Sequence, residues 1–223
     1  MVYALSNRNP YDIEIGCAVF GDPRKNPLFE MEYADPGHLD WDARGLISPT
    51  IQMVHGYPVI ESSAPKKIHW TGGKRAIPDL LFSGGVWVVG DRFRTFVERF
   101  EPATHQFIPV DIYRSKKAEP AARYYWFNIC TRLDSVDPDH TTFHKMPSHE
   151  GTFRWHKMKR ENGDYISIPG AKVVFSRRQI GSHCFWIDEN LRGLPEVLCA
   201  DGVGRAAIVE NFSGLVLTAY DEI

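Results

Sequence analysis

The chain has few cysteines and no long apolar run. Its four cysteines lie far apart, with no CxxC pair among them, so neither a disulfide framework nor a zinc knuckle is predicted. No apolar stretch approaches the ~20 residues that a membrane helix needs, and Asn7, Arg8 and Asn9 stand where a secretory signal would be apolar. These absences predict a soluble, cytoplasmic protein whose thiols are buried and unreactive.

Familiar catalytic signatures are missing as well. The sequence contains no GxSxG, no HExxH and no glycine-rich loop followed by Lys-Ser or Lys-Thr. These motifs are typical of serine hydrolases, zinc peptidases and P-loop nucleotide-binding proteins, respectively. We therefore predict no catalytic residue, no metal and no cofactor.

One polar cluster provides an alternative prediction. Asp134, Asp137, Asp139, His140 and His144 are close together in the sequence, and Asp and His side chains are common metal ligands. Two threonines lie between the histidines and weaken a helix there, so the two imidazoles need not share a face. A solvated loop is the favoured interpretation, and a metal-dependent hydrolase that uses this cluster is the alternative.

Composition and charge indicate a globular protein with an uneven charge distribution. The 223 residues, with 43% apolar and 13% aromatic, fit one large domain or two small ones. Residues 1–60 carry four Lys or Arg against eight Asp or Glu, a net charge of −4. Residues 61–180 carry 20 basic against 13 acidic residues, a net charge of +7, and residues 181–223 carry two against seven, a net charge of −5. Such blocks either neutralise each other in the fold or form separate faces that steer a charged partner. A nucleic-acid partner is not expected at a pI near 6.5, because nucleic-acid-binding domains usually have a pI above ~9.

Short strands and few helices are predicted along the chain. The clearest helix begins at Asp91, the expected N-cap, and carries an apolar stripe at Phe93, Phe96, Val97 and Phe100. Apolar, β-branched or alternating runs predict strands at residues 86–89, 106–112, 124–133, 165–168, 172–175, 184–188, 197–200 and 215–219, and a second short helix at 201–212. Pro109 places the 106–112 strand at a sheet edge. The predicted fold class is therefore α+β, with a mainly antiparallel sheet, a few short helices and more strand than helix.

A polar segment divides the chain. Residues 61–74 are predicted to form a boundary or a long loop, packed down by Ile68 and Trp70 as anchors. We expect residues 1–77 to form a strand-and-loop N-terminal region, for which a separate lobe is one arrangement, and residues 78–223 to form an α+β domain.

The most site-like feature is a basic and aromatic segment. Its basic residues are interleaved with aromatic ones, a mixture found where proteins hold phosphates and stack bases. The basic residues are Arg154, Lys157, Lys159 and Arg160, and the aromatic ones are Phe153, Trp155 and His156. The alternation fits one face of a strand equally well, with the basic residues balancing the acidic ends of the chain. A structural or protein-binding use is the favoured interpretation.

Three motifs resemble a known family. The runs LFSGGVWVVGDRF (81–93), EPATHQFIPV (101–110) and YYWFNICTRLDSVD (124–137) are similar, in this order, to the strand, helix and strand motifs of bacterial immunity proteins of the eleventh polymorphic-toxin immunity family. The resemblance covers roughly residues 78–223. No resemblance is identified for residues 1–77.

This resemblance implies a non-catalytic, antitoxin-like protein, made beside a secreted toxin, that binds the toxin and blocks it in the cytoplasm of the producing cell. The expected partner is the cognate toxin protein, and no association with a membrane is expected. Self-association into a homo-oligomer is left open. Arg154, Trp155, Lys157 and Arg160 are expected to form part of the toxin interface. The family supplies no catalytic residues.

Overall fold

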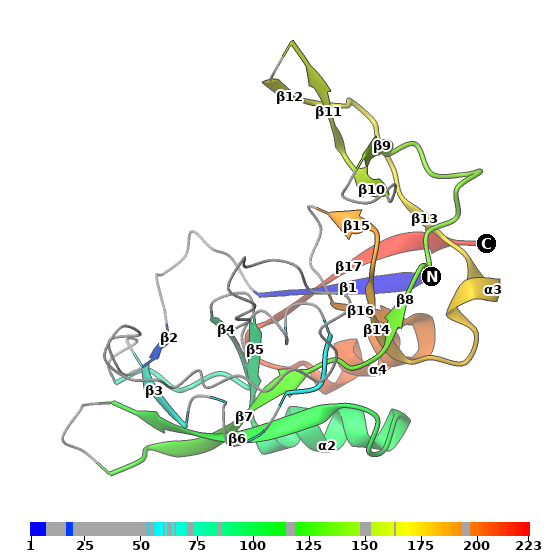
Figure 1. Cartoon of the computed structure of the whole chain (residues 1–223). Helices are drawn as coiled ribbons and strands as arrows, with labels where there is room; N and C mark the ends of the chain where they lie inside the picture. The colour runs from blue at the N-terminus through cyan, green and yellow to red at the C-terminus, as the bar shows by residue number, and fades with distance from the viewer. Residues whose placement is uncertain are drawn as a thin grey trace. The chain divides into compact units, whose positions relative to one another are not determined.

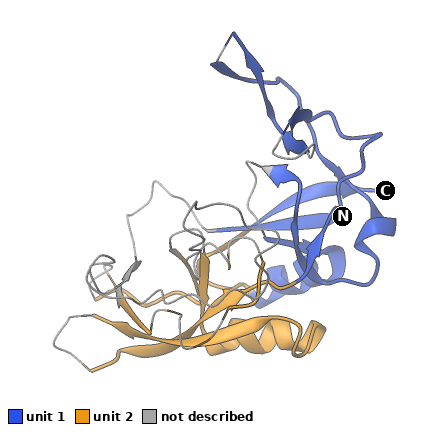
Figure 2. Ribbon diagram, in the orientation of Figure 1, with its two compact units in different colours: residues 1–6, 131–210, 217–223 blue, residues 7–130, 211–216 orange. Residues whose placement is uncertain are grey.

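The computed structural model of the chain contains two compact units (Figures 1 and 2). Unit 1 comprises residues 1–6, 131–210 and 217–223, and unit 2 comprises residues 7–130 and 211–216. The structure describes residues 1–7, 17–19, 53, 56–59, 61, 64, 66–70, 74–83, 86–114, 119–147, 153–162, 164–192 and 197–223.

A six-stranded sheet forms the framework of unit 2. Its strands, in spatial order, are β2 (Cys17–Val19), β3 (Lys67–Trp70), β6 (Gln106–Tyr113), β7 (Ala122–Asn128), β5 (Val86–Val89) and β4 (Leu80–Ser83). Strands β3 and β6 pair in parallel, and the other neighbours pair antiparallel. Along β6, Ile108, Val110 and Ile112 are buried while the residues between them are half-buried, which is the two-residue period of a strand with one core-facing side.

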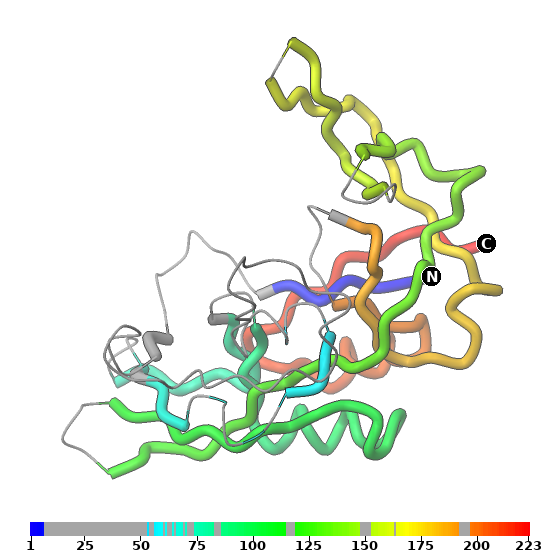
Figure 3. Tube along the Cα trace, in the orientation of Figure 1, coloured from blue at the N-terminus to red at the C-terminus, as the bar shows by residue number. Residues whose placement is uncertain are grey.

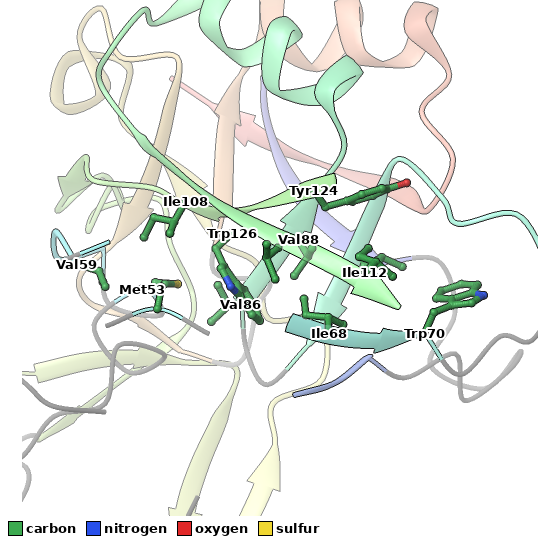
Figure 4. Packing of buried hydrophobic residues seen from close by; sticks show 13 residues of the cluster. Met53, Val59, Ile68, Trp70, Val86, Val88, Ile108, Ile112, Tyr124 and Trp126 are labelled. Carbon is green, nitrogen blue, oxygen red and sulfur yellow. The ribbon is translucent and has the colours of Figure 1, made fainter. Parts of the chain in front are cut away.

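The two faces of this sheet bury different clusters. One face carries an apolar core that includes Trp126 of β7 (Figure 4). Because successive strand residues point to opposite faces, Phe127 points to the other side, where α2 (Asp91–Phe100) packs. The ring of Phe93 on α2 lies 5.8 Å from that of Phe127 and 5.1 Å from that of Phe212. The helix therefore closes the second face with edge-to-face aromatic packing.

Helix α2 confirms the predicted stripe but differs at its first residue. Phe93, Phe96 and Val97 are buried, as the i, i+3, i+4 spacing predicts. The N-cap is Gly90, in an extended conformation, and no side chain caps the helix. Asp91 is instead the first helical residue, where its negative charge interacts favourably with the helix dipole.

A second six-stranded sheet forms unit 1. Its strands, in spatial order, are β13 (Val174–Phe175), β17 (Leu215–Glu222), β1 (Val2–Asn7), β16 (Val197–Ala200), β14 (Phe185–Asp188) and β8 (Arg132–Leu133). The N-terminal β1 and the C-terminal β17 are neighbours (Figure 3). The helices of this unit are α3 (Arg177–Ile180) and α4 (Asp201–Glu210).

Two smaller sheets complete unit 1. One has the order β15 (Leu191–Arg192), β10 (Phe153–His156), β9 (His144–Pro147), and the other pairs β11 (Met158–Glu161) with β12 (Asp164–Ser167). The predicted α+β class, with more strand than helix, is confirmed. No helix among the described residues is long and apolar enough to cross a bilayer.

The predicted strand at 124–133 is two strands that belong to different units. β7 ends at Asn128, and β8 begins at Arg132 and pairs with β14 of unit 1. Between them, the Cys130 amide donates to Nδ1 of His105 at 3.2 Å. The His105 side chain thus accepts the Cys130 N–H in place of a backbone carbonyl of a neighbouring strand, and the strand pairing of β7 ends before this residue.

Pro109 is only partly consistent with the predicted edge position. β6 lies inside its sheet, between β3 and β7. β3 pairs with residues 111–113 of β6, whereas Pro109 pairs with β7 alone among the described strands. The proline therefore occupies a stretch with one strand neighbour, although the strand as a whole is internal.

The polar segment at 61–74 contains a strand rather than a loop throughout, because β3 lies within it. Ile68 and Trp70 of β3 are 0% and 1% exposed, which confirms them as anchors. Residues 1–77 contribute β1 to the sheet of unit 1 and β3 to that of unit 2. A separate lobe made by residues 1–77 stays a prediction.

Candidate interaction surface

The basic, aromatic segment forms two strands with different surroundings. β10 is the central strand of its small sheet, with Trp155 opposite Lys145 on β9 and Leu191 on β15. After Lys157 the chain continues as β11, which pairs antiparallel with β12. The predicted interface residues are therefore divided between a supported strand and an exposed hairpin.

Trp155 lies in the core of unit 1. Its side chain is 3% exposed and belongs to the apolar cluster of that unit. The indole contacts the Phe153 ring edge-on, with 5.5 Å between centroids, and Nζ of Lys145 lies 4.7 Å from its centre. The ring therefore packs in the core and supports β10, and little of its surface faces solvent. The assignment of Arg154, Trp155, Lys157 and Arg160 to an interface stays a prediction.

The three basic residues lie closer to solvent. Arg154 is half-buried, and Lys157 and Arg160 are exposed. Residues 153–168, which we call the arm, carry four Lys or Arg against two Asp or Glu. The arm is thus a positively charged part of unit 1, and its β11–β12 hairpin lies at its end (Figure 1).

Sequence reasoning missed the β11–β12 hairpin. Glu161 pairs with Asp164, so the connection is the two-residue Asn162-Gly163. Asn162 has a φ of 52°, the left-handed conformation that Asn tolerates and that an Asn-Gly hairpin turn requires. This dipeptide between two runs of extended residues is the signal that could have identified the hairpin.

The hairpin has two different faces. Cross-strand partners share a face, and the register pairs Met158 with Ser167, Lys159 with Ile166, Arg160 with Tyr165 and Glu161 with Asp164. We call the first the Arg160–Tyr165 face, which consists of Met158, Arg160, Tyr165 and Ser167. The second is the Lys159–Ile166 face, which consists of Lys159, Glu161, Asp164 and Ile166.

Charge separates the two faces. On the Lys159–Ile166 face, Nζ of Lys159 lies 3.2 Å from Oε2 of Glu161, so its single cation is paired. On the other face, no ion pair or hydrogen bond joins the side chain of Arg160 to another residue within the described part of the chain. Tyr165 beside it is 57% exposed, and its ring lies 6.4 Å from that of His156.

The Asp/His cluster forms a turn. Oδ1 of Asp137 accepts the amides of Asp139 and His140 at 3.0 and 2.9 Å and lies 2.8 Å from Nδ1 of His140. The contact with the His140 imidazole, together with these amides, lowers the pKa of the Asp137 carboxyl. Thr141 then bonds the backbone of Val174 through its hydroxyl, as donor and as acceptor. Oδ1 of Asp137 is thus engaged within its own turn.

The metal alternative has no support from this arrangement. Across the described residues, which include Asp134, Asp137, Asp139, His140 and His144, no three His, Cys, Asp or Glu side chains come together as an ion would require. The favoured interpretation, a loop or turn, agrees with the hydrogen bonds of Asp137.

Next to this turn, a buried network joins the segment that follows β8 to strand β14. Ser135 is fully buried, and its hydroxyl donates to Oδ2 of Asp188 at 2.7 Å and accepts the indole N–H of Trp186 at 2.9 Å. The Ser135 amide donates to the same Oδ2 at 2.7 Å, and the Asn190 amide donates to Oδ1 at 2.9 Å. Burial raises the pKa of the Asp188 carboxyl, and the hydrogen bonds from Ser135 and Asn190 oppose that rise.

Two polar residues of the motifs hold a distant segment. Oε1 of Gln106 accepts the Val59 amide at 2.8 Å and Nε2 donates to the Val59 carbonyl at 3.0 Å. Nδ2 of the buried Asn128 donates to the Tyr57 carbonyl at 2.8 Å and to Gln106 at 2.9 Å. Gln106 and Asn128 therefore act as a clamp on residues 57–59.

Glu101 and His105 form a buried pair in the same unit. Nδ1 of His105 accepts the Cys130 amide, so its proton lies on Nε2, which donates to the Glu101 carboxylate at 2.7 Å. Glu101 and His105, like Gln106 and Asn128, thus hold parts of unit 2 together.

The thiols of Cys130, Cys184 and Cys199 form no disulfide within the described part of the chain, and they differ in burial. Cys199 is buried, whereas Cys130 and Cys184 are partly buried. Burial raises the pKa of the Cys199 and Cys130 thiols above the ordinary value, which disfavours the reactive thiolate.

The model of the immunity protein family Imm11 matches residues 42–221 of the chain. The comparison with curated proteins found no match.

Proposed function

Since this chain belongs to the Imm11 immunity protein family, we propose that it binds a cognate secreted toxin and neutralises it in the cytoplasm of the cell that makes both. The observation that carries this proposal is the family match over residues 42–221, through both units. The structural roles of the motif residues support it, because they explain these residues without assigning a reaction to them.

Neutralisation by binding needs a surface rather than turnover. A stable protein–protein interface buries about 1,600 Å² in total, with a few aromatic or Arg side chains supplying most of the affinity. The arm carries exposed side chains of both kinds, Arg160 and Tyr165. Its positive charge favours an acidic surface on the toxin and would accelerate docking.

The proposed interface keeps Arg154, Lys157 and Arg160 as contacting residues. Trp155 contributes indirectly, because its buried ring holds β10 and thereby positions the basic residues on either side. A homo-oligomer remains compatible with the proposal, and a nucleic-acid partner is not part of it.

The test begins with the protein encoded by the neighbouring open reading frame. Its production in a bacterial host is expected to arrest growth, and co-production of this chain to restore it. The two proteins are expected to co-purify as a stoichiometric complex. A toxic neighbour that kills equally with and without this chain, and that does not co-purify with it, would contradict the proposal.

A triple variant tests the interface residues. R154A/K157A/R160A is expected to lose affinity for the toxin. Its urea unfolding midpoint is expected to stay closer to that of the parent than a core truncation would leave it, because Lys157 and Arg160 are exposed and Arg154 is half-buried. Trp155 stays unchanged in this variant, since removal of a buried Trp costs about 3–5 kcal/mol and would unfold the arm. Undiminished affinity in the triple variant would eliminate these three residues from the interface.

A further inference from the structure

We infer that the Arg160–Tyr165 face of the β11–β12 hairpin is the part of this protein that enters an acidic groove of the toxin. The inference rests on the proposed function and narrows it from a charged region to one face of one hairpin. It adds Tyr165, which no sequence motif singled out, and excludes the Lys159–Ile166 face from the contact.

The hydrogen-bond pattern of the hairpin makes this face continuous. The Ile168 amide donates to the Lys157 carbonyl at 3.0 Å, so the pair formed by residues 157 and 168 is hydrogen-bonded. Bonded and non-bonded pairs alternate along an antiparallel ladder, and Arg160 and Tyr165 are therefore a non-bonded pair. Side chains are closest in such pairs, with Cβ atoms about 4.5–5.5 Å apart. The side chains of Arg160 and Tyr165 thus form one patch on this face.

The chemistry of this patch suits a protein partner. Tyr, Arg and Met are enriched in the buried centres of interfaces, and Tyr and Arg dominate binding hot spots. The face presents all three types, at positions 158, 160 and 165, without an acidic residue. An Arg with no neighbouring carboxylate can form a bidentate pair with an Asp or Glu of the partner, which is why the groove is expected to be acidic.

Folding alone does not explain the exposed side chains. All four residues of β12 and the last three of β11 are exposed, and an isolated two-stranded hairpin is marginally stable at best in water. Neither Tyr165 nor Ile166 belongs to the apolar core clusters of the described chain. Tyr165 keeps 57% of its surface in contact with water, a cost that burial against a partner would remove.

Ile166 provides a matched control on the same strand. It is adjacent to Tyr165, is 42% exposed and points to the opposite face. Lys159 is likewise adjacent to Arg160, on the opposite face and paired with Glu161. Each test substitution therefore has a neighbour that removes a similar side chain from the same hairpin.

The experiment measures binding of the full chain to an inactive form of the neighbouring reading frame's toxin. R160A and Y165A are each expected to weaken affinity about 10- to 100-fold, as hot-spot truncations do. K159A and I166A are expected to change it less than about 3-fold. Protection of the Ile168 amide from hydrogen exchange reports that the hairpin remains folded in every variant.

Two results would overturn the inference while leaving the proposed function intact. One is a stable wild-type complex whose affinity R160A and Y165A leave unchanged. The other is an equal loss of affinity in all four variants, which would assign binding to the hairpin without a preferred face. If the wild-type protein forms no complex, the proposed function fails, and this inference fails with it. An additional variant, R160E, is expected to weaken binding more than R160A, because it places a carboxylate in an acidic groove.

Discussion

Replacement of Ser135 by Ala should destabilise unit 1 strongly for so small a change. The hydroxyl lies in a fully buried network, where it donates to Asp188 and accepts from the Trp186 indole. The substitution removes one oxygen and leaves the backbone bond from the Ser135 amide to Asp188 in place. Two buried polar groups each lose one partner, and water cannot replace the lost oxygen without opening the core.

The expected loss of stability follows from these two groups. A buried donor without an acceptor costs about 1–3 kcal/mol, which applies to the Trp186 N–H. Asp188 loses one of its donors but keeps the amides of residues 135 and 190, so its loss is at the lower end of the ~1.5–3 kcal/mol typical of charged hydrogen bonds. The sum for S135A is about 3 kcal/mol. Ser176 is the matched control, because its side chain makes no capping bond at α3, and S176A should change stability by less than about 0.5 kcal/mol.

The pH dependence provides a second signature. The folded-state pKa of Asp188 is raised by burial, so its contribution to stability is fully present below the ordinary Asp pKa of about 3.9 and is lost as the pH rises through the raised value. Ser135 stabilises the charged carboxylate, and its removal should raise the pKa of Asp188 further. The cost of S135A is therefore expected to be larger at neutral pH than near pH 4.

Urea unfolding followed by circular dichroism at both pH values measures these effects. A double-mutant cycle with W186F isolates the indole bond, because W186F removes the donor that S135A strands. The expected coupling energy is about 1–2 kcal/mol. Additive losses within about 0.5 kcal/mol, or an identical cost of S135A at pH 4 and pH 7, would refute the proposed network.

Three further outcomes follow from local geometry. G204A should lower the unfolding temperature, because a Cβ at Gly204 would overlap the ring of Tyr3 on β1. A Cβ at Gly202 would meet nothing within 4 Å, so G202A should raise the free energy of unfolding by about 0.5–1 kcal/mol, because Ala is the better helix former. Q106A should accelerate hydrogen exchange of the Val59 amide with little change at β5, because its acceptor is removed. Cys199, whose buried thiol has a raised pKa, should react with a thiol reagent only after unfolding, and rapid native-state labelling would contradict this.

Local patterns in the sequence predicted local elements well. The α2 stripe was predictable because Phe93, Phe96 and Val97 repeat with the period of a helix packed on one side. The strand nature of β5 and β6 followed from β-branched and alternating residues in the same way. Both signals are contained within about ten residues, so no long-range information is needed to read them.

Features that depend on distant residues were not predictable. Nothing in the 124–133 run shows that the chain leaves one sheet at Asn128 and enters another at Arg132, because the cause includes His105, which accepts the Cys130 amide. The Asp/His cluster looked like a ligand set because sequence shows side-chain types, whereas the Thr141 bonds to Val174 that fix the turn span 33 residues.

The candidate surface was predicted in part. The basic character of the arm could be read directly, but Trp155 and Arg160 differ in burial although both lie in one alternating run. Burial of Trp155 depends on β9 and β15, whose pairing with β10 only the structure shows. Tyr165 was overlooked because the Asn162-Gly163 signal was not used to pair the strands on either side.

The neighbouring positions of β1 and β17 in the sheet of unit 1 affect how the chain matures on the ribosome. β1 (Val2–Asn7) is synthesised well before its sheet neighbour β17 (Leu215–Glu222), so the two strands can pair only after the chain between them has been made. Most of unit 2, residues 7–130, is complete long before that point. A chain that has not yet reached residue 215 therefore cannot complete the sheet of unit 1.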